Sequence, residues 1–383
     1  MTITGCSNGL NNFFMKWLLI ALLPYTVVFL VFWIRLQQEA RKVSHEHKKH
    51  KTGRKLISVV IPLRNEAANI QNLVSNLAEQ SLDFVHFEVI FVDDASSDST
   101  LDILRSSNKI LHDLKILEAG GVGKKKAIAL GIEQAKGEFI VTTDGDCRVK
   151  QDWLQEMYNF LITYNADMII GAVDIINTGS LMNCFIQLEF LGLQAVTEVF
   201  ARQGKPVICN GANMCFRNPG PERYAEMVKE NITSGDDIFL MESYRKQGKI
   251  IIWIDSPSSM VLTNAPGSIA SFIKQRIRWT SKSPFYTQPS LIALAVLVFL
   301  TNLIVSATFI ISFFFPGMWL IFLALFIMKS IPDLLLLTVM ARKRGKTRLL
   351  QLFLPVQLLY PFYVVTTGLA GLITGLFSSR QGK

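Results

Sequence analysis

The sequence predicts an α/β domain with a mostly parallel sheet, flanked by transmembrane helices, one on its N-terminal side and three on its C-terminal side. Half of the 383 residues are hydrophobic, and the long apolar runs lie towards the two ends of the chain. Between them, from about Lys55 to Asn264, short apolar strand patterns alternate with helix patterns. That alternation is typical of an α/β domain, and we place this domain at 56–265.

The N-terminal apolar run, predicted as a transmembrane helix over 13–34, is long enough to cross a bilayer. It carries Lys16 near its outer end, where a lysine can reach the headgroups, and Pro24, which membrane helices tolerate. A signal peptide is the alternative. We favour the membrane helix because the run is long for a signal peptide and basic residues follow it instead of a small-residue cleavage site.

Three further apolar runs predict transmembrane helices over 290–315, 318–340 and 349–377. Lys329 and Asp333 lie four residues apart in the second of these, so they share a helix face and can pair. The pair belongs either to a gate or substrate track or to the packing inside the helix bundle, and we favour packing.

Basic residues set the expected orientation of these helices. A basic linker follows the first span over 35–55, and a second basic cluster, 342–348, lies between the last two spans. The positive-inside rule places both in the cytoplasm. We therefore expect a multi-pass integral membrane protein with a cytoplasmic catalytic domain, in a bacterial inner (plasma) membrane.

The formal net charge of +9 comes largely from these flanks, which suit an anionic membrane leaflet, so membrane lipids are expected partners. No basic-aromatic pattern occurs in the soluble part, and we exclude nucleic acid as a partner. The histidines at 45, 47 and 50 fit a solvated linker better than a metal site. The five cysteines form no C-x-x-C pair, as expected of a reduced cytosolic domain.

The predicted sheet has polar clusters at the ends of its strands. Ligands of such sheets bind outside the carboxyl ends of the strands, so these clusters are the candidate site. The predicted strands are Ile57–Ile61, Phe87–Val92, Leu114–Leu117, Glu138–Val141 and Met168–Ala172, and the predicted helices are Asn65–Gln80, Ser99–Asn108, Lys124–Ala135 and Asp152–Tyr164.

The most informative cluster is Thr142-Thr143-Asp144-Gly145-Asp146, which follows the fourth predicted strand. Its two carboxylates suit Mg²⁺ or Mn²⁺, and Mg²⁺ is usually held by one or two carboxylates plus substrate phosphates. The run therefore indicates a metal that grips a diphosphate, with a solvated acidic turn as the alternative.

Two other strand ends carry candidate ligands. Pro62, Asn65 and Glu66 end the first strand, and Asp93 and Asp94 end the second. A carboxylate at a strand end can accept hydrogen bonds from a nucleobase or ribose, a role we give to Asp94 with Asp93 behind it. The nearby Asp98 is predicted to cap a helix instead.

A glycine-rich turn, Gly120 to Gly123, leads into the basic residues 124–126 without the spacing of a P-loop. Lys124 there either meets a phosphate or lies on a solvated face. Ser234-Gly235-Asp236-Asp237 precedes an apolar helix, where acidic residues are favourable in any case.

The last cluster, Gln275-Arg276-Ile277-Arg278-Trp279, lies just before the second span, in a predicted interfacial helix over 268–285. Gln275, Arg278 and Trp279 stand on one helical face. That face contacts either the membrane interface or a substrate. The apolar helix 182–202 is either a core helix or a membrane-surface helix.

Taken in order, these clusters resemble those of the membrane-bound family 2 glycosyltransferases, the group that includes the cellulose, hyaluronan, chitin and poly-N-acetylglucosamine synthases. Pro-Leu-Arg-Asn-Glu, Val-Asp-Asp, the D-x-D, an acidic pair before a helix and Q-x-x-R-W occur in the family's order. The resemblance covers the soluble segment and the membrane arrangement, and it implies the GT-A fold, a nucleotide-sugar-binding α/β domain.

The resemblance also implies a role for each matching residue. Asp94 would contact the uridine of the donor, Asp146 would hold the metal with Asp144 towards the nucleotide, and Asp237 would be the catalytic base. Arg278 would lie near the diphosphate and Trp279 beside the acceptor sugar. The donor-binding set is then Pro62, Asn65, Glu66, Asp93, Asp94, Lys124, Asp144 and Arg278; the metal set is Asp144 and Asp146; the acceptor-binding set is Gly211, Ala212, Asp236, Gln275 and Trp279.

Two positions depart from the family's pattern. Asp236 stands where the family's T-E-D has Glu, although the base position is kept. Ala129 stands where Asn is common, so no specific contact is predicted there.

One base without an enzyme nucleophile implies inversion at the anomeric carbon. We therefore expect transfer from a UDP-sugar to a glycan or lipid-linked acceptor at the cytoplasmic membrane face, giving a β-linkage. The alternatives are non-processive transfer of one sugar to a lipid carrier, a nucleotidyltransferase, and a transporter or scaffold that only senses nucleotide. Q-x-x-R-W favours a processive synthase, whereas four spans favour the lipid-carrier enzyme unless a homo-oligomer or an export partner adds helices.

Overall fold

The computed structural model describes residues 4–41, 55–107, 110–111, 114–229, 232 and 235–381, with side chains given over 16–38 in the first helix and up to 377 in the last. Most of the predicted linker and Ser234 lie outside the described residues. The chain forms two compact units. The helical unit comprises Met1–Val43, Asn177–Val199 and Pro266–Lys383, and the α/β unit comprises Ser44–Ile176 and Phe200–Ala265.

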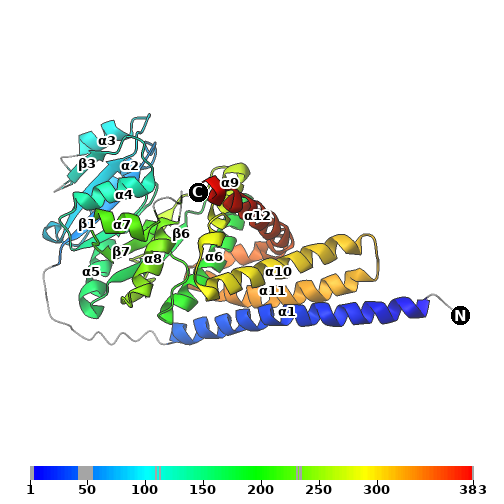
Figure 1. The fold of residues 1–383 in the computed structure, drawn as a ribbon. Coiled ribbons are helices and arrows are strands. Elements are labelled where there is room, and N and C mark those ends of the chain that lie inside the picture. The colour runs from blue at the N-terminus through cyan, green and yellow to red at the C-terminus, as the bar shows by residue number, and fades with distance from the viewer. Residues whose placement is uncertain are drawn as a thin grey trace. The chain divides into compact units, whose positions relative to one another are not determined.

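The α/β unit is built on a seven-stranded sheet with the order β3-β2-β1-β4-β7-β5-β8. Three of these strands, β1, β3 and β7, are labelled in Figure 1. All neighbouring strands are parallel except β7, which runs antiparallel to both β4 and β5. A parallel pair, β6 and β9, forms a second small sheet. The strands are β1 Ile57–Leu63, β2 Phe87–Asp93, β3 Leu114–Glu118, β4 Phe139–Thr142, β5 Met168–Gly171, β6 Val173–Ile175, β7 Met214–Arg217, β8 Ile251–Ile254 and β9 Val261–Thr263.

The predicted mostly parallel sheet is thus confirmed, and the five predicted strands correspond to β1 to β5. The helices of this unit are α2 Ile70–Ala78, α3 Thr100–Ser106, α4 Lys124–Glu133, α5 Trp153–Tyr164, α7 Pro221–Met227 and α8 Asp236–Lys246. The first helix begins five residues later than predicted, at Ile70 instead of Asn65. Asn65 has a left-handed φ of 57°, a conformation that cannot belong to a right-handed helix.

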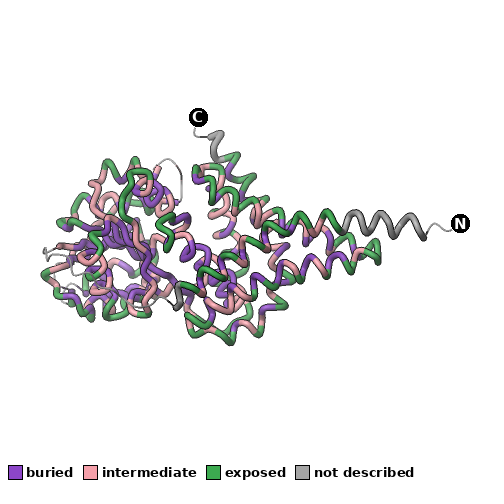
Figure 2. The backbone as a smooth tube through the Cα atoms, turned by 90° about the horizontal axis from the view of Figure 1, so that it is seen from below, coloured by how far each residue is buried: buried purple, intermediate pink, exposed green. Residues whose placement is uncertain are grey.

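The core of the α/β unit lies along both faces of the sheet, whose central strands are buried (Figure 2). The edge strand β3 is only partly buried. The seven residues of β1 and of β2 are all buried, as expected for continuous apolar runs in a parallel sheet. Helix α4 lies unusually close to the sheet, because a Cβ at Gly131 would come 2.4 Å from Val60 Cγ1. A side chain at this position would therefore push the last turn of α4 away from β1.

The helical unit contains the long apolar helices. In the part of the chain that the structure describes, five helices are long and apolar enough to cross a membrane: Lys16–Gln38, Leu181–Arg202, Pro289–Ser312, Met318–Lys343 and Thr347–Phe377. The elements of this unit are α1 Thr4–Arg41, α6 Leu181–Arg202 as far as Val199, α9 Ile269–Thr280, η4 Ser283–Phe285, α10 Pro289–Ser312, α11 Met318–Lys343, η5 Thr347–Leu352 and α12 Phe353–Gln381.

Four of these five helices correspond to the four predicted spans, and α6 is the additional candidate. The most apolar window of α6 is 72% buried within the protein, compared with 22–44% in the other four. A helix facing lipid exposes much of its surface, and Leu320 on α11 and Leu354 on α12 do so. The burial of α6 therefore favours the core-helix interpretation over the membrane-surface one.

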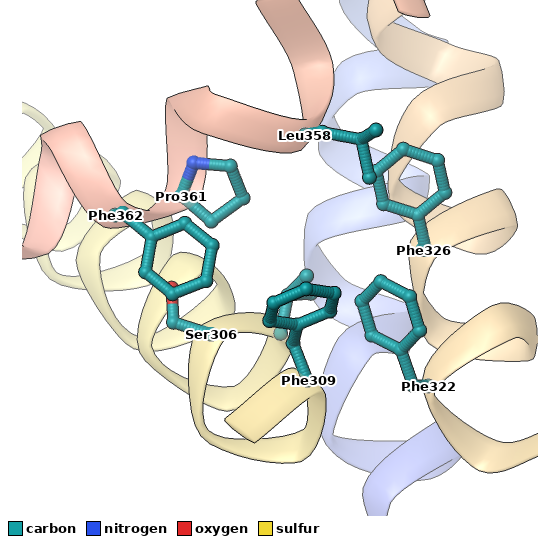
Figure 3. Close-up of a pocket in the computed structure, with 8 residues that line it drawn as sticks. Ser306, Phe309, Phe322, Phe326, Leu358, Pro361 and Phe362 are labelled. Atoms are coloured by element: carbon teal, nitrogen blue, oxygen red, sulfur yellow. The ribbon is translucent and has the colours of Figure 1, made fainter. Parts of the chain in front are cut away.

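An apolar cluster holds α1, α10 and α11 together, with Leu22, Val305 and Leu325 almost completely buried. Helices α10, α11 and α12 also line a small, mostly apolar pocket (Figure 3). The hydroxyl of Ser306 is the one polar group among its lining side chains, and it has no hydrogen-bond partner among the described residues. The rest of the lining is Val305, Phe309, Phe322, Phe326, Leu358, Pro361 and Phe362.

A buried polar network crosses the same helices. Lys329 Nζ donates to Asp333 Oδ2 at 2.7 Å, which confirms the predicted pairing on α11. Tyr25 of α1 donates to Asp333 Oδ1 at 2.6 Å, and Gln357 of α12 donates to Oδ2 at 2.7 Å. Both carboxylate oxygens thus accept hydrogen bonds, which is how a buried ion pair offsets its desolvation cost.

Replacing Asp333 by leucine is expected to destabilise the helical unit by about 3–5 kcal/mol, because it leaves the completely buried Lys329 ammonium unpaired. The double variant Lys329→Met/Asp333→Leu removes both charges and is expected to stay within about 1–2 kcal/mol of the parent. Thermal unfolding in detergent micelles measures both. Equal losses in the single and double variants would show that the charge pair itself stabilises the fold.

Candidate active site

The D-x-D run follows β4, as predicted, and a neighbouring segment fixes its shape. Arg148, two residues after Asp146, pairs with Leu262 of β9 through two backbone hydrogen bonds of 2.7 and 2.9 Å. This bridge brings the end of β9 beside the second aspartate. Thr263 Oγ1 donates to Asp146 Oδ2 at 2.9 Å, so the carboxylate is oriented from a part of the chain more than a hundred residues away.

Glu66 adds a third carboxylate near the two aspartates. A Cβ on Gly145 would lie 2.8 Å from Glu66 Cγ, so this glycine allows the glutamate to lie against the D-x-D backbone. Burial raises the pKa of Asp146, and the charge of Asp144 raises it further. Burial also raises the pKa of Glu66, with additional contributions from Asp146 and Asp144.

The two aspartates of the D-x-D fit a divalent cation. They are hard oxygen ligands, the type that Mg²⁺ and Mn²⁺ select, and their mutual repulsion would be relieved by a positive charge. Among the described residues, no group of three or more Asp, Glu, His or Cys side chains forms a closed metal cage. Two aspartates fill only part of an octahedral shell, so the remaining ligands of such an ion would be water or phosphate oxygens.

Lys124 connects the D-x-D to the acidic pair at the start of α8. Its Nζ donates to Asp144 Oδ1 at 2.5 Å. Desolvation alone would lower the pKa of Lys124, but the charges of Asp144, Asp236 and Asp237 outweigh it and hold that pKa above its usual range. The lysine is therefore a permanent positive charge facing three carboxylates, as donor-phosphate binding would require.

Asp237 is positioned by its own helix and by the loop before β7. Its Oδ1 accepts from the backbone N–H of Ile238 at 2.8 Å, and its Oδ2 accepts from Gly211 N at 3.3 Å. The carbonyl of Gly211 in turn accepts from Thr142 Oγ1, on β4, at 2.7 Å. Gly211 thus links the strand that carries the D-x-D to the predicted base. Ala212, another predicted acceptor residue, is only 2% exposed.

The two aspartates at the end of β2 bind different partners. Asp93 accepts the Ser96 hydroxyl at 2.5 Å and the Ser96 N–H at 3.0 Å, so both its oxygens shape the turn after β2. Asp94 accepts from Gly123 N at 3.0 and 3.1 Å, which ties β2 to the start of α4. Asp98 accepts from Thr100 N at 3.0 Å, but it is not the capping residue that was predicted: α3 begins at Thr100 and its N-cap is Ser99, whose side chain makes no capping hydrogen bond.

The first strand end is ordered by the same turn. Asn65 N donates to Ser96 Oγ at 2.9 Å, and Asn65 Oδ1 accepts from Ser97 N at 2.8 Å. Pro62 lies within β1, opposite Val92 of β2. One edge of the sheet therefore carries Pro62, Asn65, Glu66 and Asp94. A nucleotide is expected to bind at this edge.

Lys125 has a role that its sequence context did not reveal. Its buried ammonium donates to three backbone carbonyls, those of Val228, Lys229 and Ile232, at 2.8, 3.1 and 2.5 Å. These carbonyls follow α7 and precede Asp236. The lysine therefore anchors the segment that leads to the predicted base.

The Q-x-x-R-W residues belong to the helical unit, on α9, which begins with a Ser268 capping box. Arg278 is exposed and Trp279 is half-buried. Gln275 Oε1 accepts from Arg276 Nη1 at 2.5 Å. A helix is present around this motif, although it ends at Thr280 and not at 285 as predicted. Its place at the membrane interface and the substrate contacts of its side chains stay predictions.

The structure thus brings Glu66, Asp144, Asp146, Lys124 and Asp237 together at one edge of the α/β unit. Sequence reasoning missed the side chains that orient them. Thr263 and Lys125 carried no motif, and their roles depend on contacts between distant segments.

Comparison with known proteins agrees with this geometry. A family model described as glycosyl transferase family 2 matches residues 58–217. A second model, described as glycosyl transferase family group 2, matches residues 139–363, which is more than half of the chain. The chain belongs to glycosyltransferase family 2.

Individual relatives of this glycosyltransferase match it over shorter stretches. A poly(ribitol-phosphate) beta-glucosyltransferase from Bacillus spizizenii is 29% identical over 211 residues, 52% of this chain and 31% of the relative. Glycosyltransferase AglE from Haloferax volcanii is 34% identical over 119 residues, 31% of this chain and 39% of the relative. The matches therefore span less than two fifths of these curated relatives.

A solved structure matches over nearly the whole length. A mannosyltransferase from Pyrobaculum calidifontis, in complex with GDP-mannose and Mn²⁺, is 19% identical, with a TM-score of 0.54. The likeness covers 96% of this chain and 99% of that one. It confirms the GT-A-type α/β fold with long apolar helices on both sides.

The raised carboxyl pKa values predict how this glycosyltransferase responds to acid. A carboxyl group binds a metal only when deprotonated, so Mn²⁺ affinity is expected to fall as the pH drops through the raised pKa of Asp146. The fall should begin above the ordinary aspartate value of about 3.9. Turnover measured against pH at limiting and saturating Mn²⁺ tests this, because saturating metal should move the acid limb to lower pH. An acid limb that lies at the same pH at limiting and at saturating Mn²⁺ would contradict the assignment of Asp146 as a metal ligand.

Proposed function

We propose that the protein is an inverting, metal-dependent glycosyltransferase that moves a sugar from a UDP-sugar to a glycan or lipid-linked acceptor. The transfer takes place at the cytoplasmic face of the membrane and gives a β-linkage. The observation that carries this proposal is that two acidic clusters, the D-x-D and the pair that begins α8, lie at the same edge of the sheet. The D-x-D carboxylates, suited to a metal and diphosphate, lie around the same lysine as the acidic pair that begins α8.

Each residue then has a step to perform. Asp146 and Asp144 would hold a Mg²⁺ or Mn²⁺ ion, which would supply positive charge to offset the negative charge on the departing diphosphate. Lys124 and Arg278 add fixed positive charge to the same leaving group. Asp237 takes the proton from the acceptor hydroxyl as that oxygen attacks the anomeric carbon. No enzyme nucleophile takes part, so the configuration inverts.

The donor side is proposed to lie along Pro62, Asn65, Glu66 and Asp94, with Asp93 shaping the turn behind them. The acceptor side is proposed to include Gly211, Ala212, Asp236, Gln275 and Trp279. The low exposure of Ala212 restricts it to contributing backbone rather than side-chain contacts. The proposed membrane organisation keeps one span before 56–265 and three after 268–285, with the basic linker 35–55 facing the cytoplasm.

The acceptor class is the part that the relatives inform. The Bacillus relative is named for β-glucosyl transfer to poly(ribitol phosphate), which supports a β-linkage to a glycan-like polymer. A processive synthase of the cellulose or hyaluronan kind and a non-processive lipid-carrier enzyme remain the two further candidates for the same site.

Nucleotide binding tests the uridine part of the proposal. Thermal unfolding of the purified protein in detergent with Mn²⁺ is measured with UDP and with GDP. We expect UDP to raise the unfolding temperature more than GDP, and Asp94→Asn to reduce the UDP effect selectively. A larger effect of GDP would reject uridine as the donor base, and no effect of either nucleotide would favour a different type of donor.

A further inference from the structure

Arg276 lies beneath the Q-x-x-R-W face of α9 and is only 4% exposed. Its guanidinium forms a two-pronged ion pair with Glu189 of α6, with Nε to Oε1 at 2.8 Å and Nη2 to Oε2 at 2.5 Å. The remaining terminal nitrogen, Nη1, donates to Gln275 Oε1 at 2.5 Å. One buried cation therefore joins α6 to the first residue of the motif.

The same guanidinium also contacts the last residue of the motif. It lies 4.1 Å from the ring centroid of Trp279 and 4.6 Å from that of Phe272, close enough for cation–π attraction to both. Phe272 stacks on Tyr363 of α12 at 5.4 Å, and the Tyr363 hydroxyl donates to Glu189 Oε1 at 3.0 Å. Glu189 is thus held from a third helix, so the orientation of the guanidinium is fixed on several sides.

The arrangement is better suited to positioning than to stability. A buried ion pair is on average no more stabilising than apolar side chains of similar volume. A planar, multidentate arginine, however, fixes directions that a lysine cannot. Here it fixes the Gln275 amide and the Trp279 ring, two side chains at opposite ends of the motif.

We propose that Arg276 and Glu189 are positioning residues, which hold Gln275 and Trp279 in the conformation that receives the acceptor. The inference rests on the proposed function in one respect, the acceptor role of Gln275 and Trp279. Arg276 is too deeply buried to contact substrate itself. It acts through the two side chains that it orients.

The test compares Arg276→Lys and Glu189→Gln with the parent enzyme in detergent, using a UDP-sugar that supports turnover and a soluble oligosaccharide acceptor. We expect the KM for the acceptor to rise about tenfold or more in both variants, while the KM for the donor changes by less than about twofold. Glu198→Gln is the matched control. Glu198 lies on the same helix and is equally buried, but its ion pair runs to Lys343 of α11 at 2.6 Å. The control should leave the acceptor KM unchanged.

A loss of kcat without a change in acceptor KM, or the same rise in the control, would overturn the proposal. Trp279→Ala separates this failure from a failure of the proposed function. An unchanged acceptor KM in Trp279→Ala would reject the acceptor role of the motif. A raised KM in Trp279→Ala with normal values in both Arg276→Lys and Glu189→Gln would reject the positioning role alone.

Fluorescence gives a readout that needs no turnover. The Trp279 emission is obtained as the difference between a protein and its Trp279→Phe counterpart, with Arg276 intact or replaced by lysine. We expect acrylamide to quench this difference emission more strongly in the Arg276→Lys background, because the indole loses its partner. Equal quenching in both backgrounds would contradict the proposal, and Glu189→Gln offers a second test if Arg276→Lys does not fold.

Discussion

Replacing Asp237 by asparagine is expected to lower sugar transfer by about 10²–10⁴-fold, the usual contribution of a general base. Asparagine keeps the size of the side chain, and its single carbonyl oxygen can still accept from Ile238 N, the shorter of the two hydrogen bonds. It cannot take a proton from an acceptor hydroxyl. The UDP-dependent rise in unfolding temperature should therefore persist in this variant while transfer of a labelled sugar is lost.

The matched control is Glu222→Gln, which removes an acidic residue from the first turn of the neighbouring helix α7. The control separates the loss of a base from the loss of a favourable charge at a helix start. It should retain transfer. Normal transfer in Asp237→Asn would reject the assignment of the base, and equal losses in both variants would attribute the effect to helix stability.

Replacing Asp146 by asparagine is expected to have the second largest effect, a loss of about 10²–10³-fold in metal-dependent turnover, the size seen when one stabilising group is removed. The metal-free protein should at the same time become more stable near neutral pH. Burial and Asp144 raise the pKa of Asp146 in the folded state, so its charge opposes folding above that pKa. Asparagine removes this charge.

The raised pKa of Asp146 also sets the direction in which the stability of the fold depends on pH. For the metal-free parent, stability should increase as the pH falls through the folded-state pKa of Asp146, and this increase should be smaller in Asp146→Asn. Unfolding temperatures with and without Mn²⁺, measured from about pH 4, near the ordinary aspartate pKa, to about pH 8, test both statements. Asp152→Asn is the control, since Asp152 accepts from Ser81 Oγ at an exposed position away from the D-x-D. A Mn²⁺-induced stabilisation that survives in Asp146→Asn would place the metal elsewhere.

The parallel half of the sheet could be predicted because its strands are buried on both faces. In an α/β pattern, a short and mostly apolar run such as Ile57–Ile61 is typical of a strand that is buried on both faces. The antiparallel strand β7 could not be predicted from local sequence. Its insertion between β4 and β5 depends on pairing with residues 44 to 78 positions away, and short strands of mixed composition carry little local signal.

The candidate site, too, could be predicted only in part from local sequence. Asp144, Asp146 and Asp237 are recognisable because their order and spacing follow a chemical pattern. The groups that orient them are not. Thr263 reaches Asp146 only through the bridge between Arg148 and Leu262, and Arg276 finds Glu189 87 residues earlier in the chain. Arg276 lies within the Q-x-x-R-W motif, but neither the motif nor the adjacent residues indicate its ion-pair partner.

The most direct test of the central claim is nucleotide release by the detergent-purified protein. UDP is measured with UDP-glucose, UDP-N-acetylglucosamine and UDP-galactose, each with Mn²⁺ or Mg²⁺ and each beside an Asp146→Ala control. Release from one donor that requires the metal and is lost in the control is the predicted result, and it would also identify the sugar. Release that is independent of metal, or equal in Asp146→Ala, would contradict the account.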